Sequence, residues 1–376
     1  MWTHSFLCRD AVELEQALIE AKESVVPTIG MVFCSARHSV DRIRAIFGEH
    51  QIDLIGCTTA GEIVDDHLYE DSIAVLLMDL TLSSYLIKTA EHQVDDVYQA
   101  AYSLGETAKR QFENPALLIL SGGITVNAEM IIGGLQDGAG KNLPIYGGLA
   151  GDDLALKSTI AFSHDEASDN CLAMLAIDTD KVLLKGLAIS GWKPVGGINT
   201  ITQAEGNVIY GINGEPAYDV FIRYFGFSES GDKVDQLVTI QTNYPLQLLR
   251  KEGYAVLSSP ILVDEESRSI TLAAGVEEGE QFCFSNSPGF EVIEETVNEF
   301  GLLRKDFPEA DALILFSCKG RHGAFGPMLE DEVRGIHEQW GKPMIGLLTY
   351  GEFGDNGKGS CEFHNETCSL VILKEK

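Results

Sequence analysis

The chain has 376 residues, of which 27 are Lys or Arg and 57 are Asp or Glu, so its formal net charge is −30 with neutral histidines. Nucleic acids and anionic membranes bind proteins through cationic side chains, and this sequence contains no basic run, which argues against both as partners. The length predicts two domains, and a hydrophobic content of 45% is ample for their cores.

The composition also predicts where the protein resides. The first residues, Met1–Asp10, lack the cationic head and long apolar stretch of a secretory signal. No apolar run reaches the ~18 residues that a membrane-spanning helix needs. No Cys-x-x-Cys pair occurs, and Cys34, Cys57, Cys171 and Cys318 fall in or beside predicted buried strands, where they act as small hydrophobes. We therefore expect a soluble cytoplasmic protein without membrane insertion.

Three stretches of the chain repeat one order of elements, which begins with an amphipathic helix. Apolar residues at spacings of three and four place one apolar stripe on each helix. Asp10 and Glu13 predict a capping box at the first helix, and Ser287-Pro288 predicts the start of the third. The three stripes are Leu14, Ala17, Leu18 and Ala21; Val94, Val97, Ala101, Leu104, Ala108 and Phe112; and Phe290, Ile293, Val297 and Phe300.

A short strand follows each helix, at residues 29–34, 117–120 and 312–316. These runs are apolar throughout, as expected for strands that are covered on both faces. A second helix comes next, and its apolar spacing is clearest in Val40–Phe47 and Leu329–Trp340.

The sharpest repeat is an eight-residue strand and turn that aligns without gaps at Ile55–Glu62, Ile145–Asp152 and Ile345–Glu352. Isoleucine, glycine and an acid hold the first, seventh and eighth places in all three copies. Each copy then closes with an apolar strand, at residues 73–78, 172–177 and 369–373. Three matches in the same order indicate a genuine internal repeat.

Residues from about 182 to 285 break this pattern and predict short strands, with a short helix near Ala217–Phe225. The expected fold is therefore α/β, of the mixed α+β kind: repeated helix-strand-helix-strand units form mixed sheets, and a largely antiparallel β insertion separates the second and third units. The strands expected in the insertion are Val182–Ser190, Asn199–Ala204, Asn207–Ile212, Leu237–Gln241 and Ile270–Ala274.

The repeated turns predict a ligand site, because ligands of open α/β sheets bind beyond the carboxyl ends of the strands. An arginine suits a carboxylate or phosphate, whereas acids suit an ammonium or hydroxyl groups, so a pocket with both would fit a zwitterion. The residues expected to bind the ligand are Arg37, Glu62, Asp152, Asp153, Arg321 and Glu352. The alternative is that the glycines only form turns and the acids only brace the structure.

Other chemistries are less well supported by the residues. Gly134–Asn142 resembles a phosphate-binding loop, but it has the wrong glycine spacing and leads toward a strand. No Gly-x-Ser-x-Gly or His-Glu-x-x-His motif is present, so no catalytic residue and no metal ligand are predicted, although paired carboxylates leave an enzyme open. A noncovalent haem also stays open, with His322, His364 or His38 as its axial ligand.

Five motifs together resemble the FIST family, a bacterial sensory module with an N-terminal and a C-terminal part, and the resemblance covers nearly the whole chain in order. The motifs are Gly56–Glu62, Gly147–Asp152, Phe316–Arg321, Thr349–Glu352 and Phe363–Thr367. The resemblance implies a FIST N-terminal domain at residues 1–215, with two repeat copies and the start of the insertion, and a FIST C-terminal domain at residues 216–376.

It further implies a non-enzymatic input module that binds a small polar ligand such as an amino acid. Relatives in the family are fused to histidine kinases, cyclic-di-GMP enzymes or chemotaxis receptors, or stand beside a kinase. We therefore expect a stand-alone sensor that signals to such a separate protein, with a homodimer face as one route. A subgroup of the family binds haem and senses nitric oxide, which keeps that alternative open.

Overall fold

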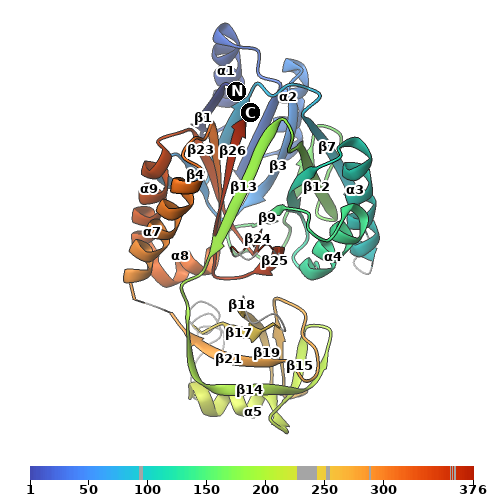
Figure 1. The fold of residues 1–376 in the computed structure, drawn as a ribbon, viewed down its shortest axis with the longest axis vertical. Helices are drawn as coiled ribbons and strands as arrows, with labels where there is room; N and C mark the ends of the chain where they lie inside the picture. The colour runs from blue at the N-terminus through green and yellow to red at the C-terminus, as the bar shows by residue number, and fades with distance from the viewer. Residues whose placement is uncertain are drawn as a thin grey trace.

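The computed structural model describes residues 1–92, 96–226, 244–250, 255–287, 289–355, 357, 359 and 361–376. They form two bodies (Figure 1). We call residues 1–190 together with 289–376 the three-unit body, and residues 193–286 the antiparallel body. Both chain ends lie at the top of the three-unit body in Figure 1, where the Met1 amino group is 2.8 Å from the Glu375 carboxylate.

The three-unit body contains three copies of one succession of elements. Unit 1 comprises β1 (Thr3–Cys8), α1 (Ala11–Ser24), β2 (Ile29–Ser35), α2 (Val40–His50), β3 (Asp53–Thr59), β4 (Glu62–Val64), β5 (His67–Tyr69) and β6 (Ile73–Met78). Unit 2 comprises β7 (Tyr85–Glu91), α3 (Val97–Gln111), β8 (Pro115–Ser121), α4 (Ala128–Ala139), β9 (Ile145–Leu149), β10 (Ala161–Ser163), β11 (Ala167–Ser168) and β12 (Cys171–Asp178). Unit 3 comprises β13 (Val182–Ile189), α7 (Glu291–Asp306), β22 (Ala312–Cys318), α8 (Lys319–Phe325), a 3-10 turn (Gly326–Met328), α9 (Leu329–Trp340), β23 (Met344–Thr349), β24 (Glu352–Asp355), β25 (Cys361–His364) and β26 (Cys368–Glu375).

Each unit builds four neighbouring strands of one mixed sheet and donates a hairpin to another unit. The four strands that each unit contributes to its own sheet run in the orders β1-β6-β2-β3, β7-β12-β8-β9 and β13-β26-β22-β23. The last two strands of each set are parallel. Hairpin β4-β5 of unit 1 extends the sheet of unit 3, β10-β11 of unit 2 extends that of unit 1, and β24-β25 of unit 3 extends that of unit 2. This cyclic exchange confirms the predicted repeat and the α/β class, and it ties the three units together.

The three sheets face one another around a central core to which all of them contribute. Phe33, Leu118 and Phe316, one from each unit, belong to this core. The opposite face of each sheet packs against the helices of its own unit. The strands are therefore covered on both faces, which explains their unbroken apolar sequences. All eight cysteines are buried and none forms a disulfide.

The antiparallel body lies below the three-unit body in Figure 1. Its sheet has the order β18-β17-β21-β14-β15-β20-β19, with β16 beside β15. The elements are β14 (Lys193–Glu205), β15 (Val208–Ile212), β16 (Glu215–Pro216), α5 (Ala217–Phe225), β17 (Leu246–Leu249), β18 (Ala255–Ser258), β19 (Pro260–Asp264), β20 (Ser269–Leu272) and β21 (Gln281–Asn286). The predicted antiparallel insertion and its short helix are confirmed.

One boundary of that insertion is wrong. Residues 182–189 form β13, which pairs with β26 in the sheet of unit 3 and matches β1 and β7 of the other units. The insertion therefore begins after Ser190. The predicted strand Leu237–Gln241 lies outside the described residues. The predicted division between residues 215 and 216 falls within β16 and stays a prediction.

The helix starts follow local hydrogen bonding. The Asp10 carboxylate accepts hydrogen bonds from the backbone N–H groups of Val12 and Glu13, and the Glu13 carboxylate accepts one from that of Arg9. The start predicted for the third helix is wrong, because α7 begins at Glu291, with Phe290 as its N-cap. Among the described residues, no helix is both long and apolar enough to cross a membrane.

Candidate functional site

The three repeated turns meet at the carboxyl ends of the parallel strands. Backbone hydrogen bonds link them pairwise, from Ala60 N–H to the Leu348 carbonyl (3.0 Å), from Gly151 N–H to the Thr58 carbonyl (2.9 Å) and from Leu149 N–H to the Gly351 carbonyl (2.9 Å). Each of these bonds joins two different units. The eight-residue sequence repeat therefore corresponds to a closed ring of turns around the junction of the three units.

The acid of unit 1 is buried inside its own turn. One oxygen of the Glu62 carboxyl accepts a hydrogen bond from the Thr59 hydroxyl, and the other accepts bonds from the Ser72 hydroxyl (2.8 Å) and the Ser72 N–H (3.1 Å). Burial raises the pKa of Glu62 to about 7, although these hydrogen bonds oppose the shift.

The acid of unit 3 repeats this arrangement. The Glu352 carboxyl accepts hydrogen bonds from the Thr349 hydroxyl and from the Thr367 hydroxyl (2.6 Å). Glu352 is fully buried, and burial raises its pKa to about 8. Thr349 stands three residues before the acid, as Thr59 does, and Thr367 directly precedes the closing strand, as Ser72 does. The hydroxyl pair is therefore part of the repeat.

Unit 2 departs from this arrangement. In unit 2, leucines stand where the other units carry the two hydroxyl groups. Leu149 pairs with Ser121 in the same register in which Thr59 pairs with Ser35. Leu172, in the closing strand, also lies opposite Ser121. Asp152 therefore lacks those donors and instead begins an added loop, residues 152–160, that precedes β10. Its carboxylate accepts hydrogen bonds from the N–H groups of Leu156 (3.0 Å), Lys157 (2.7 Å) and Ser158 (3.1 Å).

A tyrosine of unit 3 holds the added loop in place. The Tyr350 hydroxyl donates to the Asp152 carboxylate (2.6 Å) and accepts from the N–H groups of Leu154 (2.7 Å) and Asp152 (3.2 Å). Burial acts to raise the pKa of Asp152, but the bonds from Tyr350 and the loop N–H groups bring it below its ordinary value. Asp153, Leu154 and Leu156 all have positive φ angles, of 55°, 62° and 50°, which cost free energy in residues with a side chain.

The structure does not bring the two predicted arginines together. Arg321 is fully buried, where its guanidinium pairs with Glu332 and donates to the carbonyl of Ser190 (2.6 Å). Its remaining contacts are to the Thr296 hydroxyl, the Glu366 carbonyl and the rings of Trp192 and Phe325. All of these bonds are internal, so a ligand-binding role for Arg321 stays a prediction that requires them to open.

Arg37 lies at the surface of unit 1. Its side chain is 71% exposed and pairs with Asp71 at 2.6 Å. The adjacent Ser35 hydroxyl donates to the Asp153 carboxylate of unit 2 at 3.1 Å. Arg37 and Asp153 therefore both lie at the carboxyl end of unit 1, whereas Arg321 lies within unit 3.

The sequence reasoning overlooked a lysine that connects the three units. Lys319 follows β22 in unit 3, and its Nζ donates to the carbonyl of Ala60 in unit 1 (2.9 Å). Burial lowers its pKa, and the carboxylates of Glu70, Asp153 and Glu62 interact with it and oppose that shift. We call Ser35, Glu62, Glu70, Asp153 and Lys319 the Lys319 junction. Tyr350 stands in the repeated turn of unit 3, and Lys319 stands in the motif Phe316–Arg321 at the end of β22, which are the signals that could have identified them.

Two of the three histidines considered for a haem have a ring nitrogen paired with a backbone carbonyl. His364 is buried, and its Nε2 pairs with the Gly354 carbonyl at 3.2 Å. The Nε2 of His38 pairs with the Asp71 carbonyl at 3.2 Å. His322 is half-buried, and burial and the cation of Lys319 lower its pKa. A haem ligand needs an unpaired ring nitrogen, and the Nε2 atoms of His364 and His38 already pair with backbone carbonyls. A haem therefore stays a prediction, and we derive no role from it.

Comparison with known proteins gives the family. The model of the FIST N domain matches residues 28–215, and that of the FIST C domain matches residues 217–355. An uncharacterized protein of Methanocaldococcus jannaschii is 22% identical over 261 residues, which are 65% of this chain and 47% of that protein. The chain thus spans about half the length of this curated relative.

FIST domains are associated with sensory signal transduction and small-ligand binding. The two matched regions together cover most of the sequence, and the chain belongs to the FIST family.

Proposed function

We propose that this protein is a non-enzymatic sensor that binds a small polar ligand, such as an amino acid, at the Lys319 junction. It then signals to another protein, such as a histidine kinase or a cyclic-di-GMP enzyme. The family association with sensory signal transduction supports the general role. The choice of this junction rests on its position where loops of all three units meet.

The observation that carries the proposal is the mixture of charges around Lys319. One half-buried cation lies within electrostatic reach of the carboxyls of Glu62, Glu70 and Asp153, which come from two other units. A ligand carboxylate has Lys319 as its partner, and a ligand ammonium reduces the local excess of negative charge. Because the groups belong to different units, a ligand that bridges them can favour one arrangement of the units over another, as a sensor requires.

The added loop of unit 2 gives that arrangement a movable part. Residues with unfavourable backbone conformations persist only where their surroundings hold them, and they concentrate at ligand clamps and switches. Here the loop is held by Tyr350 of unit 3 and contacts Ser35 of unit 1 through Asp153. A ligand that takes Asp153 as a partner competes with the Ser35 contact and so changes how the loop is held.

Thermal-shift screening of amino acids and related metabolites, followed by calorimetric titration, tests the site. A ligand present at ~100 times its Kd stabilises the folded protein by about 2.7 kcal/mol, which is readily detected. We expect Lys319→Met and Asp153→Asn each to weaken the binding of any hit about tenfold or more.

The matched control is Lys181→Met, because the Lys181 ammonium also pairs with a carboxylate, that of Asp178 at 3.2 Å, away from the junction. This variant should bind like the wild type. Binding that survives unchanged in Lys319→Met would remove the proposed site, and a screen without any hit for the wild type would contradict the proposed ligand class.

A further inference from the structure

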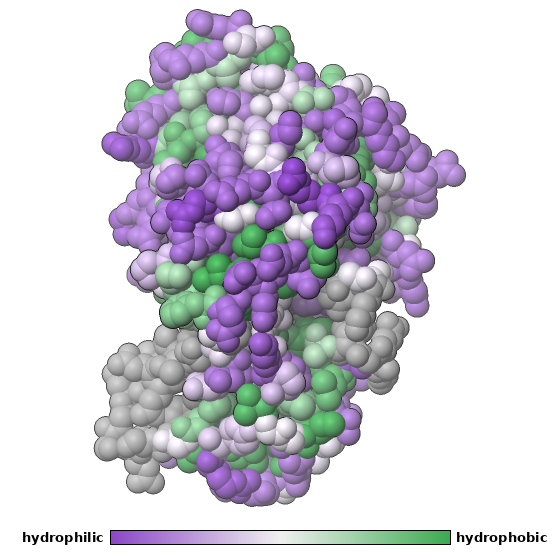
Figure 2. Space-filling model, turned by 60° about the vertical axis from the view of Figure 1, so that its left-hand side comes forward, coloured by the Kyte–Doolittle hydropathy of each residue, from purple (hydrophilic) through white to green (hydrophobic). Residues whose placement is uncertain are grey.

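The two bodies meet at a narrow waist (Figure 2), where buried contacts hold the antiparallel body on unit 3. The connecting segment is fixed there, because the Arg321 guanidinium donates to the Ser190 carbonyl (2.6 Å) and lies against the Trp192 ring. Leu257 of the antiparallel body packs into the apolar core of unit 3, and its carbonyl accepts a hydrogen bond from the Asn365 N–H (3.2 Å). Arg321, Trp192, Leu257 and Asn365 are all buried, so solvent does not compete for these contacts.

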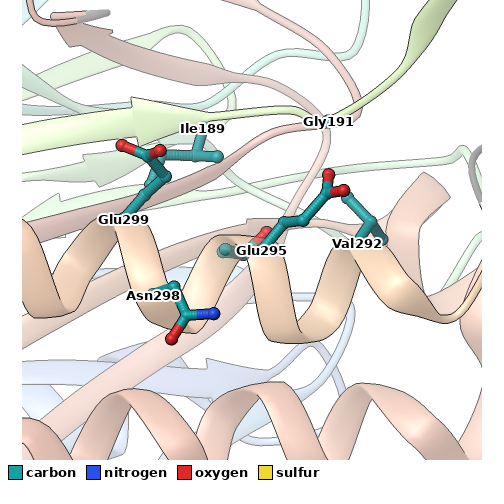
Figure 3. A pocket seen from close by; sticks show the side chains of 7 residues that line it. Ile189, Gly191, Val292, Glu295, Asn298 and Glu299 are labelled. Carbon is teal, nitrogen blue, oxygen red and sulfur yellow. The ribbon is translucent and has the colours of Figure 1, made fainter.

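The connecting segment has a point about which it can turn, at Gly191. The φ angle of Gly191 is 85°, in the left-handed region that glycine adopts without strain. A groove of about 440 Å³ lies between this segment and α7. Figure 3 shows Glu295 of α7 extending toward the segment. The glycine and the space beside it allow the backbone to rotate, so unit 3 provides a pivot for the antiparallel body.

On unit 2, by contrast, the antiparallel body is held by an ion pair near the surface. Arg250, which follows β17, pairs at 2.6 Å with Glu129 in the first turn of α4, and the two side chains are 20% and 32% exposed. A Cβ on Gly275 would lie 2.7 Å from a carboxylate oxygen of Glu129, so glycine at this position leaves room for the pair. Beside the pair, Ala274 of the antiparallel body packs against the core of unit 2.

Arg250 has a second carboxylate partner within its own body. Glu280, directly before β21, pairs with the other terminal nitrogen of Arg250 at 2.5 Å and is only 10% exposed. Burial raises the pKa of Glu129, and the carboxylates of Glu280 and Glu362 add to this shift against the attraction of Arg250. If Glu129 moves away, Arg250 keeps Glu280, and Glu129 gains water and leaves two like charges. Separation of the pair therefore leaves no buried charge without a partner, which is the main cost of breaking buried ion pairs.

We propose that Arg250 and Glu129 form a releasable latch between the two bodies. When the latch opens, the antiparallel body turns about Gly191, its contact with unit 2 at Ala274 opens, and its contacts with unit 3 stay in place. Added salt favours opening, because ions screen a partly exposed pair more strongly than buried contacts. The latch is a property of the fold and does not rest on the ligand proposed for the Lys319 junction.

The reactivity of introduced thiols measures opening on each side separately. Ala274→Cys places a thiol at the contact with unit 2, and Leu257→Cys places one at the contact with unit 3. All eight native cysteines are buried, and the chain without an introduced thiol gives the background reaction with dithionitrobenzoate. The reaction rate of a buried thiol follows the population of the open form, so it reports opening that is too rare to see directly.

The decisive comparison is between Glu129→Gln and Glu280→Gln, because each removes one carboxylate from the same arginine and only Glu129 belongs to the other body. We expect Glu129→Gln to speed the reaction of the Ala274→Cys thiol about fivefold, and Glu280→Gln to speed it less than about twofold. The Leu257→Cys thiol should change by less than about twofold in both backgrounds.

Three outcomes would overturn the proposal. Equal acceleration by Glu129→Gln and Glu280→Gln would show that the carboxylate from unit 2 has no special role. An unchanged rate for the Ala274→Cys thiol in Glu129→Gln would show that the pair does not hold the bodies together. Equal acceleration of the Ala274→Cys and Leu257→Cys thiols would show that the bodies separate as a whole and do not pivot on unit 3.

Sodium chloride tests the latch without a substitution in it. Added salt should speed the reaction of the Ala274→Cys thiol when Glu129 is present and have a smaller effect in Glu129→Gln, and equal salt effects would contradict the latch. Thermal unfolding shows whether each variant folds. If Ala274→Cys does not fold, Ala273→Cys provides a second reporter, because Ala273 packs partly buried against the same core.

Discussion

Units 1 and 3 each carry an acid at an equivalent position, but the acid of unit 1 is exposed and that of unit 3 is buried. Asp71 and Glu366 each precede the residue that binds the buried glutamate of its unit, and their φ angles are nearly identical, 55° and 54°. The side chain of Asp71 is 48% exposed and pairs with Arg37. Glu366 is only 2% exposed, and burial raises its pKa well above the ordinary value.

The antiparallel body accounts for this difference. Its Ser259 hydroxyl donates to the Glu366 carboxyl at 3.3 Å, and its Leu257 carbonyl accepts from the Asn365 N–H at 3.2 Å. The contact covers the carboxyl end of unit 3, whereas Arg37 and Asp71 of unit 1 remain exposed. The comparison teaches that a duplicated turn can become structural in one copy and stay available for a ligand in another. This supports the choice of the Lys319 junction, to which unit 1 contributes Ser35, Glu62 and Glu70.

The largest expected effect separates the two arginines. Arg321→Met leaves the buried Glu332 without its partner, and breaking a buried pair in this way costs about 3–5 kcal/mol. Arg37→Met removes only a surface pair, which contributes less than about 1 kcal/mol. Urea unfolding of both variants measures the difference. Similar losses of unfolding free energy in the two variants would show that the surroundings of Arg37 and Arg321 do not differ as their burial indicates.

A smaller effect distinguishes the acids of units 1 and 3 from that of unit 2. The pKa values of Glu62 and Glu352 rise from an ordinary 4.5 to about 7 and about 8, so within this range the unfolded chain has lost a proton that the folded protein keeps. Stability attributable to these groups therefore falls as pH rises from about 5 to about 8, by a few kcal/mol for each group at ~1.4 kcal/mol per pKa unit.

Glu62→Gln and Glu352→Gln should flatten that dependence in unfolding experiments at pH 5, 6, 7 and 8. Asp152→Asn is the control. The pKa of Asp152 lies below its ordinary value, so its contribution is already complete at pH 5 and is lost only under more acidic conditions. If the unfolding free energy depended on pH as strongly in both glutamine variants as in the wild type, Glu62 and Glu352 would not be the cause of that dependence.

The sequence predicts the repeat because repetition is a property of the chain itself. Apolar runs such as residues 29–34 and 312–316 indicate buried strands, and the glycine-acid turns mark the ends where the units meet. The exchange of hairpins between units leaves no such mark, since β4 reads as an ordinary strand whichever sheet it joins. The burial of Arg321 is equally hidden, because it depends on Glu332 and Thr296, which lie on other elements.

Helix α4 shows a second limit of sequence reasoning. Gly134 and Gly138 argue against a helix, since glycine is unfavourable within one by about 1 kcal/mol relative to alanine. In the structure they let α4 approach α3. A Cβ on Gly134 would lie 2.4 Å from the Tyr98 carbonyl oxygen, and one on Gly138 would lie 2.3 Å from that of Tyr102. Close packing against another helix is the compensation, and it cannot be seen from α4 alone.

The smallest expected effect concerns the loop that unit 2 adds. Tyr350→Phe removes a hydroxyl that binds the Asp152 carboxylate and two loop N–H groups, so we expect a loss of about 1–2 kcal/mol and faster hydrogen exchange at Leu154. Tyr98→Phe is the matched control, because that hydroxyl also donates to an aspartate at 2.6 Å, Asp137, but on the exposed surface of α3 and α4. Its loss should stay below about 0.5 kcal/mol. Equal losses of unfolding free energy in the two variants would show that the Tyr350 hydroxyl is an ordinary surface contact. Another interaction would then have to hold the added loop in its positive φ angles.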